Sequence, residues 1–426
     1  MPDGTFSVKI VSRAKQQIKR APGEPAPRRR KKMQPTKVKT AVVGCGMISS
    51  IYIRNLSQMF SVIDLCAVCN RTRETAEARA KEFGIARAMT IDEAAADPEI
   101  ELIVNLTPAF AHYDIIKKML MAGKHVYTEK IFTTDLEKSR ELVALANEKG
   151  LYLGVAPDTV LGAGIQTARY LIDTGMIGEV TSVQMAVNRN QALNSEVFTF
   201  LQGEGGSLPF DVGVYYVGAL VALLGSVTHI AAFGNPAPVH RPQMAFLNAG
   251  TEPWQIPGMN TVGASLRMEN GAVCTVHMDG NSIGETQHAF TIYGTRGILK
   301  IGDPDKFADP ITLILPENAP VQMPFTHGFD GKNYLGAPTA FDHYGHRGIG
   351  AAELAWALRK GRPRARLSGE YGLHCQEILQ GMEIAAETGG VYEVQSRCEM
   401  KGLRPGYFSG MFGGAMRGDA EASLME

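Results

Sequence analysis

The stretch VKTAVVGCGMIS, residues 38–49, decides the fold. A short apolar run ends in Gly44 and Gly46, and a helical pattern follows at once. Gly44 permits a sharp turn, and Gly46 lets the backbone approach a bound phosphate; Ser49 is small enough for close helix–strand packing. Because a helix N-terminus attracts anions, and because a second strand-like run follows about twenty residues later, we predict a dinucleotide site; a glycine turn without a ligand is the alternative.

Strand-like and helical patterns alternate from residue 38 to residue 155. The strand-like runs are 40–44, 65–69, 102–106, 125–128 and 151–155, and the helical patterns between them are 49–60, 72–83, 111–122 and 135–149. This alternation predicts βαβ units and a parallel sheet with right-handed crossovers.

The pattern changes after residue 157. One amphipathic helix is expected near 162–173, and long alternating runs then predict a mostly antiparallel sheet with one buried face. Helical patterns at 349–360 and 370–388 follow. We therefore expect an α/β fold in which an N-terminal domain with a parallel sheet precedes a second domain with a mostly antiparallel sheet.

Charge is unevenly distributed, although the 43 basic and 43 acidic residues balance. Residues 1–40 hold 12 Lys/Arg and 2 Asp/Glu, which leaves a mildly acidic body and argues against nucleic acid as a partner. The run PRRRKK at 27–32 is interpreted as part of a disordered leader, with a nucleic-acid or membrane-surface arm as the alternative. Since no secretory h-region or membrane-length apolar run is found, we expect a cytoplasmic protein without a membrane partner.

The six cysteines are expected to be reduced thiols. Cys66 and Cys69 have C-x-x-C spacing, but they lie in a strand-like run where positions three apart face opposite ways. We interpret them as packing residues, and the sequence predicts no metal site.

Polar residues that follow the next strands complete the expected cofactor site. Asn70 and Arg71 occupy the place where NAD-preferring folds usually carry an acidic residue. Arg71 suits a 2′-phosphate, which favours NADP over NAD; the alternative is a solvated arginine and an enzyme that accepts both. Thr107 and Pro108 end the next strand, and His112 nearby is either a ligand contact or a structural histidine.

A lysine, a carboxylate and a phenol are the candidate catalytic groups. Glu129 and Lys130 end the 125–128 run at the same sheet edge, near the expected reactive end of the cofactor. Asp211 and Tyr215 are four residues apart, which places them on one face if a helix includes both. A tyrosine pKa near 10 is too high for easy proton transfer, and a neighbouring ammonium lowers it, so Lys130 and Tyr215 are complementary if they meet. The alternatives are an exposed loop lysine and a core tyrosine.

Six ordered stretches resemble the Gfo/Idh/MocA family, named for glucose–fructose oxidoreductase and inositol dehydrogenase: AVVGCGMIS, NLTPAFAH, AGKHVYTEK, LIDTGMIGEV, GGSLPFDVGVYY and TIYGTRGILKI. The resemblance covers about residues 38–398. It implies a Rossmann domain at 37–157 and an α+β substrate and oligomerisation domain at 158–398 with a large, open, mostly antiparallel sheet. It also implies a homodimer or homotetramer formed through the large sheet. The composition of the two ends predicts a disordered basic leader at 1–36 and a loosely ordered tail at 399–426.

The resemblance also assigns roles to individual residues. Lys130 corresponds to the lysine of the family's E-K-P motif, with Ile131 in place of the proline. Asp211 and Tyr215 correspond to the D-x-x-x-H motif, in which sugar oxidoreductases and dihydrodiol dehydrogenases of the family can carry tyrosine. The expected cofactor contacts are Gly44, Gly46, Met47, Ile48, Asn70, Arg71, Thr107, Pro108, His112, Glu129 and Lys130, and the expected substrate contacts are Asp158, Thr159, Asn188 and Arg189.

These features predict an NAD(P)-dependent oxidoreductase that acts on a hydroxyl of a sugar, polyol or cyclic alcohol. Tyr215 would transfer the alcohol proton, Lys130 would bind the reacting oxygen and lower the Tyr215 pKa, and Asp211 would orient substrate and lysine. One alternative is a glycoside-processing or sugar–sugar oxidoreductase whose cofactor stays bound and is recycled. Another is a non-catalytic dinucleotide sensor.

Overall fold

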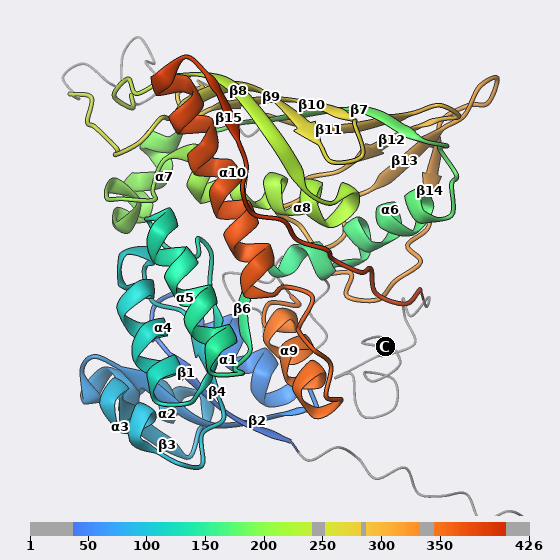
Figure 1. Ribbon diagram of the computed structural model, residues 1–426. Helices are drawn as coiled ribbons and strands as arrows, with labels where there is room; N and C mark the ends of the chain where they lie inside the picture. Colours follow the sequence, from blue (N-terminus) through green and yellow to red (C-terminus); the bar gives the residue numbers. More distant parts are fainter. Residues whose placement is uncertain (1–36, 241–251, 283–286, 332–344, 406–426) are drawn as a thin grey trace, which may run out of the picture. The chain divides into compact units, whose positions relative to one another are not determined.

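The computed structural model describes residues 37–240, 252–282, 287–331 and 345–405. The predicted leader and the predicted tail beyond residue 405 lie outside the described residues. The N-terminal part forms a six-stranded sheet, and the following part forms a nine-stranded sheet (Figure 1).

The first sheet has the strand order β3-β2-β1-β4-β5-β6, and every neighbouring pair is parallel, which confirms the predicted parallel sheet. Its strands are β1 (Val38–Val43), β2 (Ile63–Asn70), β3 (Arg87–Thr90), β4 (Leu102–Asn105), β5 (His125–Thr128) and β6 (Leu153–Val155). The connecting helices are α1 (Ser49–Gln58), α2 (Arg73–Phe83), α3 (Ile91–Ala96), α4 (His112–Met121) and α5 (Leu136–Glu148).

Helices cover both faces of this sheet. Val42 of β1 belongs to the same apolar cluster as Ile51 of α1. Its neighbours Ala41 and Val43 belong to a second cluster, which contains Ile116 of α4. Because successive strand residues point to opposite faces, β1 must be apolar throughout, as its sequence is.

The second sheet is mostly antiparallel, as predicted, and among the described strands only β7 and β10 pair in parallel. Its order is β14-β13-β12-β11-β7-β10-β9-β8-β15. The strands are β7 (Val180–Asn188), β8 (Val227–Asn235), β9 (Thr261–Met268), β10 (Val273–Asp279), β11 (Gln287–Gly294), β12 (Ile298–Ile301), β13 (Ile311–Ile314), β14 (Val321–Met323) and β15 (Val391–Glu393).

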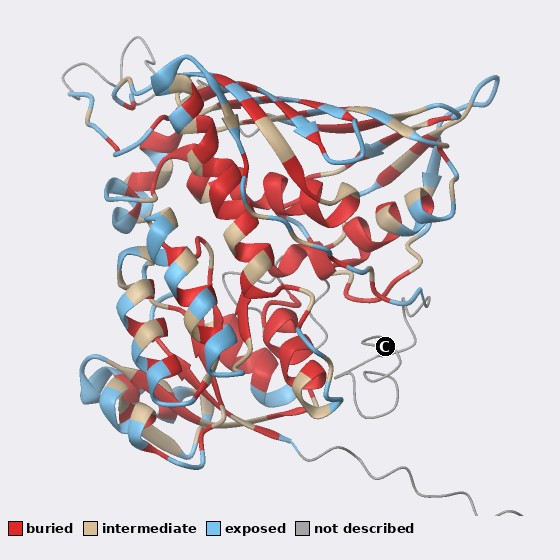
Figure 2. Ribbon diagram, viewed as in Figure 1, coloured by how far each residue is buried: buried red, intermediate tan, exposed pale blue. Residues whose placement is uncertain are grey.

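One face of the second sheet is covered by helices, and buried and exposed residues alternate along β9 and β10 (Figure 2). The covering helices are α6 (Ala163–Asp173), α8 (Val214–Leu224) and α10 (Gly369–Thr388). No helix among the described residues combines the length and apolar character needed to cross a membrane.

The other described helices and turns are shorter or lie between the elements above. Helix α7 (Gln191–Val197) follows β7, and α9 (Ile349–Arg359) packs against β5 and β6 of the first sheet. Three single turns and one π-helical turn complete the elements of the described residues: η1 (Ala109–Ala111), η2 (Asp158–Leu161), η3 (Thr199–Gln202) and η4 (Pro209–Gly213). The last of these leads directly into α8.

Candidate functional site

A cavity of about 530 Å³ lies at the carboxyl end of the parallel sheet. Its wall comprises the turn after β1, the residues that follow β2, β4 and β5, the α7–η3 segment and the start of α8. This edge is where open α/β sheets bind ligands. The cavity also contains two side chains that no sequence motif indicated, Asp305 and Arg347.

The glycine turn after β1 forms one wall of the cavity. Gly44 has φ of 103°, and a Cβ atom there would lie 2.8 Å from the carbonyl carbon of Leu106, so this position requires glycine. A Cβ atom on Gly46 would meet nothing within 4 Å and would fill space that the cavity provides. Helix α1 begins here without an acidic residue in its first turn and without a side-chain cap at Ile48. The turn therefore fits the phosphates of a dinucleotide, which need close backbone approach and a helix N-terminus.

Nine of the eleven expected cofactor contacts line the cavity, and Arg71 and His112 do not. Met47, Ile48, Asn70, Thr107, Pro108, Glu129 and Lys130 all line the cavity. Arg71 is exposed and lies outside the cavity wall.

His112 does not line the cavity, and of the two roles that the sequence left open it has the structural one. Its ring is fully buried, with Nδ1 2.7 Å from the carbonyl oxygen of Ile131 and Nε2 2.7 Å from that of Thr107. Burial lowers the pKa of His112, although these carbonyl groups oppose the shift. The expected cofactor contact is thus corrected: His112 holds the two backbone segments that carry Thr107 and Lys130.

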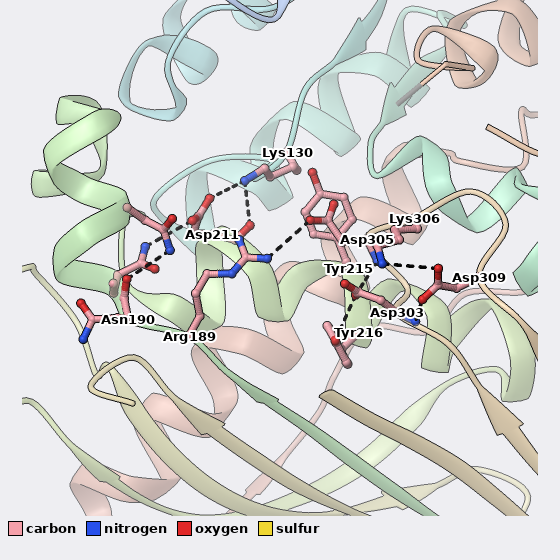
Figure 3. Close-up of polar contacts among 12 residues, drawn as sticks. Lys130, Arg189, Asn190, Asp211, Tyr215, Tyr216, Asp303, Asp305, Lys306 and Asp309 are labelled. Carbon is pink, nitrogen blue, oxygen red and sulfur yellow. Dashed lines mark hydrogen bonds and ion pairs between the residues drawn. The ribbon is translucent and has the colours of Figure 1, made fainter. Parts of the chain in front are cut away.

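Lys130 and Asp211 form an ion pair inside the cavity. Nζ of Lys130 lies 2.7 Å from Oδ1 of Asp211 and donates a second hydrogen bond of 2.7 Å to its main-chain oxygen (Figure 3). Gln191 donates to Oδ2 of Asp211 at 3.2 Å. Burial alone would raise the pKa of Asp211, but Lys130 and Gln191 outweigh it and hold this pKa below its usual value. Asp211 is therefore a carboxylate at neutral pH.

Tyr215 lies in the same cavity, but its hydroxyl partner is an arginine. Nη2 of Arg347 donates a 3.0 Å hydrogen bond to the hydroxyl oxygen of Tyr215. Lys130 instead lies against the ring of Tyr215, with Nζ 5.5 Å from the centroid. Lys130 and Tyr215 are therefore neighbours, but the cation that hydrogen-bonds the phenol oxygen is Arg347.

The loop before α9 fixes Arg347, whose guanidinium is almost fully buried. Asn55 of α1 donates from Nδ2 to the main-chain oxygen of Arg347 at 2.8 Å. Asp158 accepts hydrogen bonds from the backbone N–H groups of Gly348 and Gly350. No local motif marks Arg347, because its place depends on contacts with segments far away in the sequence.

Three of the four expected substrate contacts lie outside the cavity. Asp158 and Thr159 are fully buried, and the Asp158 carboxylate accepts a hydrogen bond from Tyr127 in addition to those of the Arg347 loop. Burial raises the pKa of Asp158. Asn188 ends β7 without reaching the cavity, whereas Arg189 does line it. The expectation for Asp158 and Thr159 is corrected: this turn supports the loop that carries Arg347.

Asp305 is the second side chain that the sequence did not indicate. It lies between β12 and β13, with Oδ1 3.6 Å from Nη2 of Arg347. Its Oδ2 lies 3.9 Å from Nη2 of Arg189 (Figure 3). Burial raises the pKa of Asp305 to about 6, against the opposing influence of Arg347. Asp211 and Asp305 thus both line the cavity, the first paired with Lys130 and the second near Arg347.

Two sequence comparisons agree with this architecture. Residues 38–156 match the family described as "Oxidoreductase family, NAD-binding Rossmann fold", and residues 165–300 match the "GFO/IDH/MocA C-terminal domain". Together the two regions span more than half of the chain.

Relatives and solved structures point the same way. The chain is 30% identical over 201 residues to an uncharacterized oxidoreductase, C26H5.09c, of Schizosaccharomyces pombe, and 25% identical over 196 residues to scyllo-inositol 2-dehydrogenase (NADP(+)) IolW of Bacillus subtilis. Each alignment covers 46% of this chain and 54% of the relative, so the chain spans about half the length of these relatives.

A solved levoglucosan dehydrogenase in complex with NADH shares the fold, with a TM-score of 0.69 at 17% identity over 85% of this chain and 100% of that one. The same two domains therefore recur in sequence and in structure. The chain belongs to the GFO/IDH/MocA family of oxidoreductases, with an NAD-binding Rossmann domain followed by the family's C-terminal domain.

Proposed function

We propose that this chain is an NAD(P)-dependent oxidoreductase that moves a hydride between nicotinamide and a hydroxyl-bearing carbon of a sugar, polyol or cyclic alcohol. One observation carries the proposal: Lys130, Asp211 and Tyr215 share a cavity with the glycine turn. Relatives named inositol dehydrogenase and levoglucosan dehydrogenase support this substrate class.

The glycine turn would hold the cofactor phosphates, and the ends of β4 and β5 would line the rest of its site. Backbone groups at Gly46, Met47 and Ile48 lie at the N-terminus of α1, where a phosphate is favoured. Thr107 and Glu129 line the cavity beyond them, and Glu129 is fixed by a 2.6 Å hydrogen bond from Tyr52. When bound, nicotinamide supplies the hydride chemistry.

The side chains of the cavity would manage the proton and the reacting oxygen. Tyr215 would accept or donate the alcohol proton, while the guanidinium of Arg347 stabilises negative charge on the phenol oxygen at 3.0 Å. Lys130 would donate a hydrogen bond to the reacting oxygen, and Asp211 would hold its ammonium in place. Arg347 thus takes the charge-stabilising role that the sequence assigned to Lys130.

The preferred cofactor in this proposal is NADP. Asn70 ends β2 and Arg71 follows it, so neither position carries a carboxylate that would repel a 2′-phosphate, and the related IolW is named as NADP-dependent. Replacing Arg71 with alanine should weaken NADP binding about tenfold or more, because charged hydrogen bonds contribute about 1.5–3 kcal/mol, and should leave NAD binding unchanged. Fluorescence titration of both nucleotides measures this; equal losses for both would contradict the preference.

The activity can be tested by a screen of sugars and cyclic polyols with both cofactors. Net formation of reduced nicotinamide, followed by its absorbance, is the expected result. Lys130→Ala and Tyr215→Phe should each lower kcat at least about a hundredfold. Near-wild-type turnover in both variants would reject the assignment. Product without net reduced cofactor would indicate recycling, and nucleotide binding without turnover would indicate a sensor.

We also propose that the chain forms a homo-oligomer through the uncovered face of the nine-stranded sheet. Phe233 of β8 and Val273 of β10 are exposed on this sheet, at 83% and 46% of their surface. Isolated exposed apolar residues are common on protein surfaces, so the proposal rests on the family resemblance and on the face that the described helices leave uncovered, and Phe233 provides the test. Light scattering should give a dimer or tetramer, and Phe233→Glu should shift it toward the monomer; a monomeric wild-type protein would refute this.

A further inference from the structure

The Asp305 carboxylate lines the cavity without a hydrogen-bond donor. Its side chain is 10% exposed, and within the described residues no N–H or O–H group donates to either carboxylate oxygen. The two nearby carboxylates differ. Asp303 accepts a 3.0 Å hydrogen bond from the Tyr216 hydroxyl, and Asp309 accepts one of 2.9 Å from the backbone N–H of Asp303.

The buried carboxylate oxygens of Asp305 are strong hydrogen-bond acceptors that no donor in the described part of the protein satisfies. An ionised carboxylate offers about four acceptor sites, and burying one without a donor is unfavourable. The two guanidinium groups, Arg347 at 3.6 Å and Arg189 at 3.9 Å, are beyond hydrogen-bond length. The two guanidinium groups therefore offset the charge of Asp305, but among the described residues its oxygen atoms still lack a hydrogen-bond donor.

The position of Asp305 relative to Tyr215 indicates which donor fits. One nitrogen, Nη2 of Arg347, hydrogen-bonds the Tyr215 hydroxyl and also lies 3.6 Å from Oδ1 of Asp305. The phenol and the carboxylate therefore flank a single guanidinium nitrogen. A substrate hydroxyl that meets Tyr215 would bring a hydroxyl on the adjacent carbon toward Asp305.

We propose that Asp305 and Arg189 form a subsite for a second substrate hydroxyl, next to the one that reacts. Asp305 accepts the hydrogen bond of this hydroxyl, and Arg189 donates one to its oxygen. The subsite selects vicinal diols, such as sugars and polyols, over alcohols with an isolated hydroxyl. The identification of the reacting hydroxyl rests on the proposed function, whereas the diol selectivity can be measured by binding alone.

The test compares the binding of cis-1,2-cyclohexanediol and cyclohexanol to the cofactor-saturated protein by calorimetry. The two compounds differ by one hydroxyl group. The wild type should bind the diol at least about tenfold more tightly, since a hydrogen bond to a charged group has this magnitude. Asp305→Ala should lose this preference. Asp305→Asn keeps the size of the side chain and one acceptor oxygen but not the charge, so its preference for the diol should be about tenfold smaller than that of the wild type.

The control is Asp309→Asn, on the same loop. The Asp309 side chain pairs with Lys306 and is not part of the cavity wall, so this variant should keep the wild-type preference. Equal binding of the two compounds by the wild type would overturn the subsite, and so would a full preference in Asp305→Asn. If the preference follows Asp305 but no alcohol reduces the cofactor, the subsite stands and the proposed oxidoreductase activity fails.

Discussion

Removal of the Lys130 amine should cost both stability and turnover, and the geometry of the ion pair gives the size of each effect. Nζ lies 2.7 Å from Oδ1 of Asp211, and the two side chains are only 18% and 12% exposed. In Lys130→Ala, the Asp211 carboxylate keeps a 3.2 Å hydrogen bond from Gln191 and loses its cation. Breaking a buried pair in this way typically destabilises by about 3–5 kcal/mol, and losing a catalytic group lowers kcat about a hundredfold or more.

The double variant Lys130→Ala/Asp211→Asn separates the two effects. Removing both charges leaves no unpaired carboxylate, so most of the lost stability should return while turnover stays low. Urea denaturation gives the free energy of unfolding, and steady-state kinetics gives kcat.

A matched control is Lys117→Ala. Lys117 pairs with Glu141 at the same 2.7 Å, but both side chains are about half exposed. The free energy of unfolding should therefore change little, because exposed ion pairs contribute little to stability, and turnover should be normal. If Lys130→Ala were as stable as this control and as active as the wild type, the ion pair would have neither role.

Three further predictions follow from the cavity and its supports. Arg347→Met should lower kcat at least about tenfold with an unchanged nucleotide dissociation constant, because charge stabilisation at Tyr215 is lost while the glycine turn is unchanged; a loss confined to nucleotide binding would contradict this. The pKa of Asp305 is raised from 3.8 to about 6, so its ionisation destabilises the folded state as pH rises through that range. The free energy of unfolding of Asp305→Asn relative to wild type should increase by about 2 kcal/mol between pH 4 and pH 8, and a flat difference in urea titrations would refute it. Asp158→Ala leaves three buried donors without their acceptor and should destabilise by about 3 kcal/mol, again by urea denaturation, whereas wild-type stability would show that the Arg347 loop needs no such support.

The parallel sheet could be predicted because its signals are local. The glycine turn, the apolar strands and the amphipathic helices can each be recognised within about ten to fifteen residues of sequence. The strand β3 and the helix α3 were missed because they are only four and six residues long. Helix α3 does carry a local signal, a capping box between Thr90 and Glu93, that a search for such pairs would have found.

The cavity was only half predictable, for a physical reason. Lys130, Asp211 and Tyr215 lie at ends of regular elements, so strand and helix spacing brings them to the sheet edge. Arg347 and Asp305 lie in loops, where position depends on distant partners such as Asn55 and Asp158. The same dependence explains the error at Asp158: its carboxylate meets backbone donors nearly two hundred residues further along the chain.

Helix α9 has a consequence for how this chain can be divided. It packs against β5 and β6, and a Cβ atom on Gly154 would lie 2.9 Å from Leu354, so the nucleotide-binding half is completed by residues from near the end of the sequence. Arg359 at its C-terminal end also pairs with Glu101. A fragment cut at residue 157 would expose the apolar surface that α9 covers and should aggregate on expression. Joining residues 345–367 to it through a short linker should restore a soluble nucleotide-binding protein.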